Sequence, residues 1–303
     1  MRSSPTGPTS FVLPDLVSHC KFPLSYHPNG DKIAWESVAW LDSNCPDLSA
    51  KQRRALCGLQ SGELTSYCYN QASSPERLRV VSDFLTYLFH LDNISDGMMT
   101  RETDVLADVV MNAFWFNDKC MPTRGPGKEQ PDDELDPGKL AGDFWSQAIS
   151  DCGVGARARF RETMGLFFEA VNIQARMRDE ETIPDLEAYI DDIFSYNVEQ
   201  SRGDTHNMIV ILMQYHGHTL QSAVDYVGEL CAQTIDTFCE NKERLPSWGP
   251  EIDDMVARYV KGLQDWIVGS FHWSFQTQRY FGKDGLDIKK HRYVKLLPLE
   301  AAN

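Results

Sequence analysis

The chain has 303 residues, of which 29 are Lys or Arg and 44 are Asp or Glu, so its formal net charge is −15. This acidic balance argues against binding to nucleic acid or to an anionic membrane surface, because both require a basic face that displaces counterions. Hydrophobic residues make up 42% of the chain and charged residues 24%, which is typical of a globular protein. A chain of this length is long enough to enclose a buried cavity.

The cysteines and the first residues indicate a cytoplasmic protein. The eight cysteines form no Cys-x-x-Cys pair and no zinc-finger spacing, so we expect them to be buried free thiols. Residues 1–30 are polar and contain several prolines, and they lack the apolar stretch of a secretory signal. The longest apolar run of the later half, residues 208–213, is far shorter than the roughly 20 residues of a membrane-spanning helix, which excludes membrane insertion.

The hydrophobic pattern predicts an all-α protein. Apolar residues recur mainly at spacings of three and four, whereas the alternation that is typical of strands is nearly absent. We expect an N-terminal tail and irregular entry segment at residues 1–30, one helical domain at residues 31–282 and a C-terminal tail at residues 283–303. No internal repeat is visible, so the domain is expected to be a single bundle of helices.

The elements can be placed in chain order from their start and stop signals. Asp47 is expected to be the N-cap of a helix that runs to about Tyr69, and Ser74-Pro75 opens the next helix, with proline in its first turn. Residues 121–138 are rich in proline and glycine and are expected to form a loop. The remaining helices are expected at about residues 156–179, from about residue 182 onward, at residues 207–215, and on either side of a break at residues 245–250.

An acidic pair lies at the end of the helix that begins near Pro75. Steps of three and four residues connect Val81, Leu85 and Leu88 with Asp92 and Asp96, so an apolar stripe leads into two carboxylates on the same face. Two inward-facing carboxylates one turn apart either take up protons or bind a divalent cation. The alternative for this pair alone is a helix end that faces water.

A second acidic group follows about a hundred residues later. Asp191, Ser195 and Glu199 are spaced at i, i+4 and i+8, which places three oxygen ligands along one face of a helix. Such a row suits Mg²⁺, because this ion binds oxygen ligands and keeps coordination positions for water and phosphate. Ser195 alone is equally typical of a hydrogen-bonded core serine, but the three residues together with the first acidic pair favour a metal site.

A third group lies near the C-terminus, where Arg279 and Tyr280 follow the aromatic-rich residues 266–278. A guanidinium group and a phenol hydroxyl are good partners for phosphate oxygens. Such a pair is common on protein surfaces, but beside two predicted metal motifs it indicates a phosphate-binding site.

Together these residues resemble the class I terpene cyclases, and specifically the fungal sesquiterpene synthases. DNISD at residues 92–96, DDIFSYNVE at residues 191–199 and QRY at residues 278–280 occur in the order of that family, and the similarity extends from about residue 10 to residue 282. The resemblance implies a single-domain helical bundle around a central cavity that binds farnesyl diphosphate, as a monomer or weak homodimer. The implied reaction is ionisation of this substrate, cyclisation of the carbocation to a sesquiterpene and release of diphosphate.

The resemblance also implies a role for each motif. Three Mg²⁺ ions, or Mn²⁺ in their place, would be bound by Asp92 and Asp96 of the first motif and by Asp191, Ser195 and Glu199 of the second. No side chain is expected to act as a catalytic acid or base, since the metal ions supply the Lewis acidity that lets diphosphate leave.

The resemblance to the fungal sesquiterpene synthases also suggests which residues contact the substrate. Arg279, Tyr280 and Arg202 would bind the diphosphate group. Aromatic faces can stabilise a carbocation without reacting with it, although each aromatic residue taken singly is more typical of core packing. The candidate aromatic residues of the cavity wall are Phe84, Phe89 and Trp273.

The sequence departs from the family pattern before the second motif. The interval from Asp92 to Asp191 is 99 residues, which is several tens of residues shorter than the family usually has. In relatives, a stretch similar to residues 183–190 is followed by a basic pair, a glycine and further helical segments, whereas here Ile190 directly precedes Asp191. We therefore expect an internal deletion, as in a mis-spliced form, that removes the diphosphate-sensing arginine and a helix break lining the cavity.

Two other functions are compatible with parts of the pattern. A helical scaffold that binds diphosphate without turnover would be consistent with the deletion, but the retained metal ligands argue against it. A prenyl-chain-elongating transferase would normally carry two similar DDxxD motifs rather than the two different motifs present here. Similarity to the protoilludene-type group favours a first 1,11-ring closure, although the product depends on the contour of the cavity.

Overall fold

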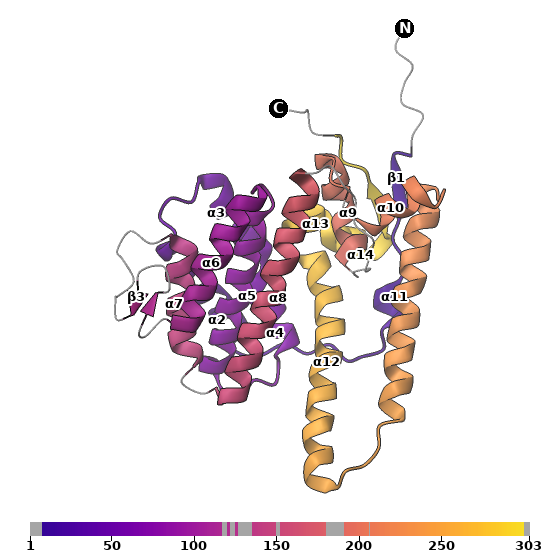
Figure 1. The fold of residues 1–303 in the computed structure, drawn as a ribbon. Helices are drawn as coiled ribbons and strands as arrows, with labels where there is room; N and C mark the ends of the chain where they lie inside the picture. Colours follow the sequence, from indigo (N-terminus) through magenta and orange to yellow (C-terminus); the bar gives the residue numbers. More distant parts are fainter. Residues whose placement is uncertain are drawn as a thin grey trace.

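The computed structural model describes residues 8–116, 120–121, 125–126, 135–149, 152–179, 191–205 and 207–299. Most of this part of the chain is helical, as predicted, and the strands are short (Figure 1). Strand β1 (Ser10–Val12) pairs with β4 (Tyr293–Lys295), and β2 (Cys120–Met121) pairs with β3 (Gly125–Pro126), both antiparallel. The helices are α1 (Leu16–His19), α2 (Gly30–Asn44), α3 (Ala50–Leu59), α4 (Ser61–Cys68), α5 (Pro75–Ser95), α6 (Thr100–Phe116), α7 (Asp136–Ala148), α8 (Val154–Asp179), α9 (Asp191–Arg202), α10 (Met208–Tyr215), α11 (Leu220–Glu243), α12 (Pro250–Gln276), α13 (Gln278–Phe281), the 3-10 helix η1 (Gly282–Asp284) and α14 (Gly285–His291).

The predicted helix from Asp47 to about Tyr69 is two helices in the structure. Helix α3 begins after Ser49, whose side chain accepts a bond from the Gln52 N–H in a capping box. It ends at Gln60, whose φ of 55° lies in the left-handed region, and α4 begins directly afterwards. The prediction was wrong here because the residue at the break is a glutamine, a residue type that rarely adopts this conformation and so does not mark a helix end in the sequence. By contrast, Ser74 caps α5 and Pro75 lies in its first turn, as predicted.

Helix α5 carries the first acidic motif through the middle of the bundle. It packs against α2, α4 and α7, and its residues Leu78, Tyr87 and Leu91 are completely buried. One core cluster joins α5 to α2, α6, α7 and α8, and the other joins it to the helices from α9 onward. The end of α5 therefore lies where these two groups of helices meet.

The two ends of the chain form a small sheet. Ser10 pairs with Lys295 and Val12 with Tyr293, and both described ends of the chain lie on the same side of the molecule (Figure 1). Phe11 of β1 and Val294 of β4 are only 2% and 1% exposed, so the sheet is anchored in the core. The expected tails thus contain regular structure, since residues 283–303 also include η1 and α14.

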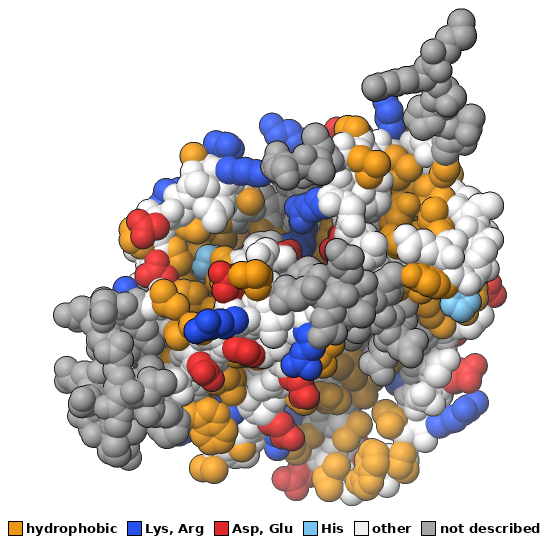
Figure 2. Space-filling view, turned by 45° about the horizontal axis from the view of Figure 1, so that its top comes forward, with side chains coloured by type: hydrophobic (Ala, Val, Ile, Leu, Met, Phe, Trp, Pro, Cys, Tyr) orange, Lys and Arg blue, Asp and Glu red, His pale blue; other side chains and the backbone are white. Residues whose placement is uncertain are grey.

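Several hydrophobic side chains remain exposed, and Figure 2 shows many of this type on the face it presents. On α12, exposed Ile252, Met255 and Tyr259 follow one another at helical spacing. On α8, Leu166 and Ile173 are likewise exposed and lie on one face. The long helices α11 and α12 extend together beyond the rest of the bundle (Figure 1), which leaves part of α12 uncovered.

Within the described residues, no helix has the length and apolar character that a membrane span requires.

Helix α14 is attached to α12 by a pH-sensitive hydrogen bond. Lys289 Nζ lies 2.8 Å from His272 Nδ1, and because an ammonium group only donates, this nitrogen of His272 must accept and the ring is neutral. Burial, together with the nearby Lys289 charge, lowers the pKa of His272. The folded state therefore binds fewer protons than the unfolded state as pH falls below about 6.5, and stability is lost on acidification.

We expect the melting temperature to fall between about pH 7.5 and about pH 5.5 by less in His272→Gln than in the wild type. Thermal unfolding followed by circular dichroism at several pH values measures this difference. His216→Gln, which changes an exposed histidine, is the control and should keep the wild-type slope. Equal slopes in all three proteins would show that His272 does not contribute to the acid sensitivity.

Candidate active site

The C-terminal end of α5 is bound by Arg279 of α13. Arg279 Nη2 donates to Asp92 Oδ2 at 2.7 Å, and Nη1 donates to Asn93 Oδ1 at 3.0 Å. The guanidinium group also lies 5.6 Å from the ring centroid of Phe89. Although burial acts to lower the pKa of Arg279, its acidic neighbours, Asp92 first among them, raise it, so the guanidinium group stays charged.

The next residue of α13 binds the second acidic motif. Tyr280 Oη donates to Asp191 Oδ1 at 2.5 Å, at the start of α9. Because Arg279 and Tyr280 are neighbours in the chain, they bring Asp92 and Asp191 to the same place, although these residues are 99 positions apart. The structure thus joins the first motif, the second motif and the predicted phosphate-binding pair.

A buried threonine sets the position of α13. Thr277 lies between α12 and α13 and is 0% exposed, and its hydroxyl accepts a bond from the Arg279 N–H at 3.2 Å. The same hydroxyl donates to Gly58 O of α3 at 3.3 Å. The cap therefore fixes where the short helix begins, and with it the directions of Arg279 and Tyr280.

Helix α9 presents Ser195 and Glu199 to a residue that the sequence did not identify. The amide group of Asn207, which is 0% exposed, donates to Glu199 Oε2 at 2.9 Å and lies 3.4 Å from Ser195 Oγ. It also donates to Asp192 O at 2.9 Å, while its own oxygen accepts from Ile209 N–H and caps α10. The capping role was visible in the sequence before an apolar run, but the contact with Glu199 depends on the path of the intervening loop.

Several neighbouring carboxylates give the site a need for positive charge. Desolvation by the surrounding protein raises the pKa of Asp191, and the hydrogen bond from Tyr280 and the charge of Arg279 offset this only in part. Burial likewise raises the pKa of Glu199, partly offset by Asn207 and Ser195, and raises that of Asp192 to about 7. Asp92 and Asp191 also repel each other, as do Asp191 and Glu199. A divalent cation would relieve this repulsion.

The donor atoms suit a hard cation. Carboxylate and hydroxyl oxygens are the ligands that Mg²⁺ and Mn²⁺ prefer. In the described part of the chain, no three His, Cys, Asp or Glu side chains are gathered closely enough to enclose a metal ion. Instead, Arg279 and Tyr280 hold Asp92 and Asp191, so a cation bound by these carboxylates would share or replace those bonds.

Two predicted site residues lie at exposed helix ends. Asp96 is the C-cap residue of α5, one turn beyond Asp92, and Arg202 is the last residue of α9, three positions beyond Glu199. Their assignment to the metal and to the diphosphate continues to rest on the sequence pattern.

The three candidate aromatic residues do not lie together. Phe89 and Trp273 pack against each other with ring centroids 5.5 Å apart, next to Arg279 and Tyr280 of α13. Phe84 instead packs against Phe144 and Phe160, at 5.3 Å and 5.2 Å, in the core between α5, α7 and α8. Two of the three residues are therefore close to the candidate site.

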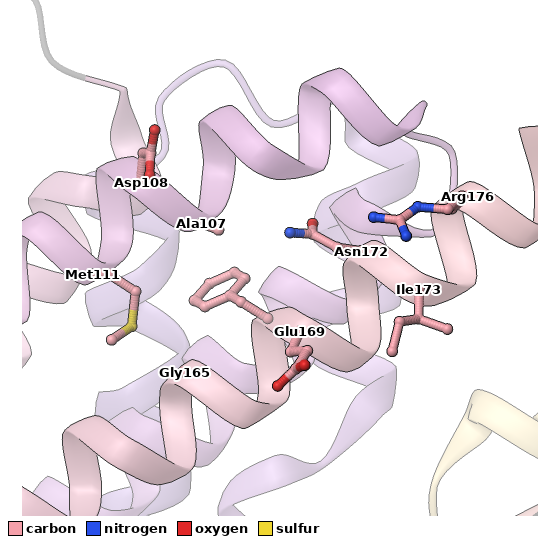
Figure 3. Close-up of a pocket in the computed structure, with 9 residues that line it drawn as sticks. Ala107, Asp108, Met111, Gly165, Glu169, Asn172, Ile173 and Arg176 are labelled. Atoms are coloured by element: carbon pink, nitrogen blue, oxygen red, sulfur yellow. The ribbon is translucent and has the colours of Figure 1, made fainter.

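A cavity of about 460 Å³ lies elsewhere, between α6 and α8 (Figure 3). No predicted metal, diphosphate or aromatic residue lines this cavity, so it is distinct from the candidate site. It is lined by Ala107, Asp108, Met111, Gly165, Phe168, Glu169, Asn172, Ile173 and Arg176.

Comparison with known proteins gives consistent matches. A family model described as terpene synthase family 2, C-terminal metal binding, matches residues 83–191 and 189–237. Sesquiterpene synthase Agr3 of Cyclocybe aegerita is 79% identical over 349 aligned positions, which cover 99% of this chain and 98% of that protein. The alpha-muurolene synthase of Coprinopsis cinerea is 64% identical over 339 positions, covering 96% of this chain and 79% of that protein.

Solved structures agree with the fold. A variant of cucumene synthase has a TM-score of 0.66 at 18% identity and covers 86% of this chain and 99% of its own. Hedycaryol synthase in complex with HEPES has a TM-score of 0.66 at 15% identity and covers 87% of this chain and 98% of its own. These similarities confirm the predicted all-α terpene synthase fold.

The bond between Tyr280 and Asp191 is expected to stabilise the fold. In Tyr280→Phe the Asp191 carboxylate loses its phenol donor, so the free energy of unfolding should fall by about 1–3 kcal/mol. Chemical denaturation measures this change. Tyr259→Phe, which alters a tyrosine that is 70% exposed on α12, should change the stability little. A Tyr280→Phe protein as stable as this control would contradict the role given to the bond.

Proposed function

Because the chain belongs to the terpene synthase family and is a class I sesquiterpene synthase of the fungal type, we propose that its substrate is farnesyl diphosphate and its metal ion is Mg²⁺. The reaction is ionisation of this substrate and cyclisation of the carbocation, with release of diphosphate. The observation that carries the proposal is the contact of Arg279 with Asp92 and of Tyr280 with Asp191, which unites three motifs in one site. The matched family model is one for metal binding, so a divalent cation is implied.

We assign Asp92 and Asp96 to the metal ions of the first motif and Asp191, Ser195 and Glu199 to those of the second. Three Mg²⁺ ions are expected, and Mn²⁺ is an alternative. Support comes from the oxygen donors and from the raised pKa values of Asp191 and Glu199, which arise mainly from desolvation and which a bound cation would lower. When bound, the ions supply Lewis acidity and positive charge for the departing diphosphate.

Arg279 and Tyr280 of α13 bind carboxylate oxygens in the free protein and would bind diphosphate oxygens in the proposed complex. Arg279 holds a carboxylate of α5, and a diphosphate offers oxygens of similar geometry and higher charge. The guanidinium and phenol groups would therefore exchange Asp92 and Asp191 for substrate oxygens. This exchange frees both carboxylates for cations. Arg202 is a further candidate for contact with the diphosphate.

Phe89 and Trp273, which lie beside α13, are assigned a role in stabilising the carbocation. Phe89 lies 5.6 Å from the Arg279 guanidinium and packs against Trp273, so both rings lie next to the position assigned to the diphosphate. Such faces stabilise a nearby cation, and the apolar surroundings exclude the water that would react with it.

The function is tested by incubating the purified protein with farnesyl diphosphate and Mg²⁺ and analysing the products by gas chromatography with mass detection. Asp92→Ala and Glu199→Ala should each reduce product formation by at least about 100-fold, because each removes a proposed metal ligand. Glu240→Ala, which alters an exposed carboxylate on α11, should retain activity. Full activity in both site variants would rule out the proposed metal ligands, and the product spectrum would test the 1,11-closure.

We also propose that the chain lacks an internal segment next to Asp191. The two parts of the family-model match meet at residues 189–191. The alignment with the Cyclocybe aegerita relative spans 349 positions against 303 residues here, so at least 46 of its positions have no counterpart in this chain. Exposed apolar side chains such as Leu166 on α8 and Tyr259 on α12 are compatible with the loss of a covering segment.

Restoring the segment tests this proposal. Insertion of the corresponding residues of the Cyclocybe aegerita relative between Ile190 and Asp191 should raise kcat/KM on the order of 100-fold, because closing the site restores its geometry and excludes water. It should also reduce binding of an apolar fluorescent dye. A Gly/Ser linker of the same length is the control and should do neither. If the linker and the native segment behaved alike, the deletion proposal would be refuted.

A further inference from the structure

The terminal sheet is held at both outer edges by a side-chain amide. At the β4 edge, Asn197 of α9 donates from Nδ2 to Lys295 O at 3.1 Å, and its Oδ1 accepts from Leu297 N at 2.9 Å. At the β1 edge, Gln221 of α11 donates from Nε2 to Val12 O at 3.0 Å, and its Oε1 accepts from Val12 N at 2.8 Å. The two helices are thus attached to the same sheet by the same kind of bonds.

These bonds lie on the side of α9 that faces away from the candidate metal ligands. Asn197 follows Ser195 by two positions, which places the two side chains about 200° apart around the helix. Gln200 adds a third bond to the terminal segment, from Nε2 to Leu297 O at 2.9 Å, and Tyr196 packs edge-on against Phe11 of β1 at 5.7 Å. Helix α9 therefore lies between the candidate site and the paired chain ends.

The terminal segment is a firm support for this contact. Val294 is 1% exposed, and Leu296 N donates to Thr9 O at 2.9 Å, which continues the pairing beyond β4. Asn197 itself is only 5% exposed, so water cannot readily replace its bonds. Since α9 has only 12 residues, a rotation about its axis at Asn197 would move Ser195 and Glu199 together.

We propose that Asn197 is a positioning residue, which fixes the rotation of α9 and so directs Ser195 and Glu199 at the metal ion. This inference rests on the proposed function, because it takes these two residues as metal ligands. Asn197 itself does not touch the ion. It acts through the main chain of residues 295 and 297, so the last strand of the chain supports a metal site formed by other elements.

The test compares Asn197→Ala with Gln221→Ala in the full-length protein. Each variant removes an amide that is bonded to the main chain of the same sheet, but α11 carries no candidate site residue. Both should lower the melting temperature. Only Asn197→Ala should weaken the binding of Mg²⁺, by about 10–100-fold in isothermal titration calorimetry, as is typical for groups that orient a ligand. If Asn197→Ala does not fold, Asn197→Ser, which keeps a hydroxyl group at this position, is compared with Gln221→Ala instead.

Two outcomes would overturn the inference. If Asn197→Ala and Gln221→Ala changed Mg²⁺ affinity to the same extent, Asn197 would serve only stability. If Glu199→Ala bound Mg²⁺ as the wild type does, Glu199 would not be a ligand, and both the proposed metal site and the role of Asn197 would fail. Loss of binding in Glu199→Ala together with normal binding in Asn197→Ala would refute the positioning role alone.

Discussion

The site depends on several carboxylates that lie close together and need positive partners. Arg279 and Tyr280 meet this need for Asp92 and Asp191, and in doing so they connect α5 with α9 through the short helix α13. A buried carboxylate that lacked such partners would take up a proton or destabilise the fold. The hydrogen bonds of α13 therefore hold α5 and α9 together in the free protein, and in the proposed function they also keep the acidic groups in place for a divalent cation.

The spacing of residues predicted which acidic and hydroxyl side chains share a helix face, because a helix places residues four apart on one side whatever the rest of the fold does. The stripe that leads to Asp92 and the row from Asp191 to Glu199 follow from this rule. The contacts of Asn207 and Asn197 could not be predicted in this way. They join residues to loops and strands whose positions depend on the tertiary fold, and asparagine is equally common in turns and caps.

Other differences between the predictions and the structure also depend on the tertiary fold. Phe84 was a candidate for the cavity wall because of its aromatic ring, but a helix with as many buried residues as α5 has apolar neighbours on several sides, and Phe84 packs with Phe144 and Phe160. Residues 1–30 were expected to be a tail and irregular entry segment because of their polar, proline-containing composition, and the three-residue strand β1 is too short to show a recognisable alternation. The family became apparent from residue identities, and the proposed deletion rests on the interval between two motifs rather than on periodicity. The segment before Asp191, including the helix expected from about residue 182, lies outside the described residues.

The pairing of β1 with β4 has a consequence for the order of folding. Ser10 and Lys295 are 285 residues apart, so this contact closes a loop that contains nearly the whole chain. Contacts of such long range are slow to form, and in the cell this one must wait until the C-terminal strand has left the ribosome. Asn197 of α9 can form its bonds with the C-terminal segment only then, so the α9 side of the candidate site is completed after the rest of the bundle has been synthesised.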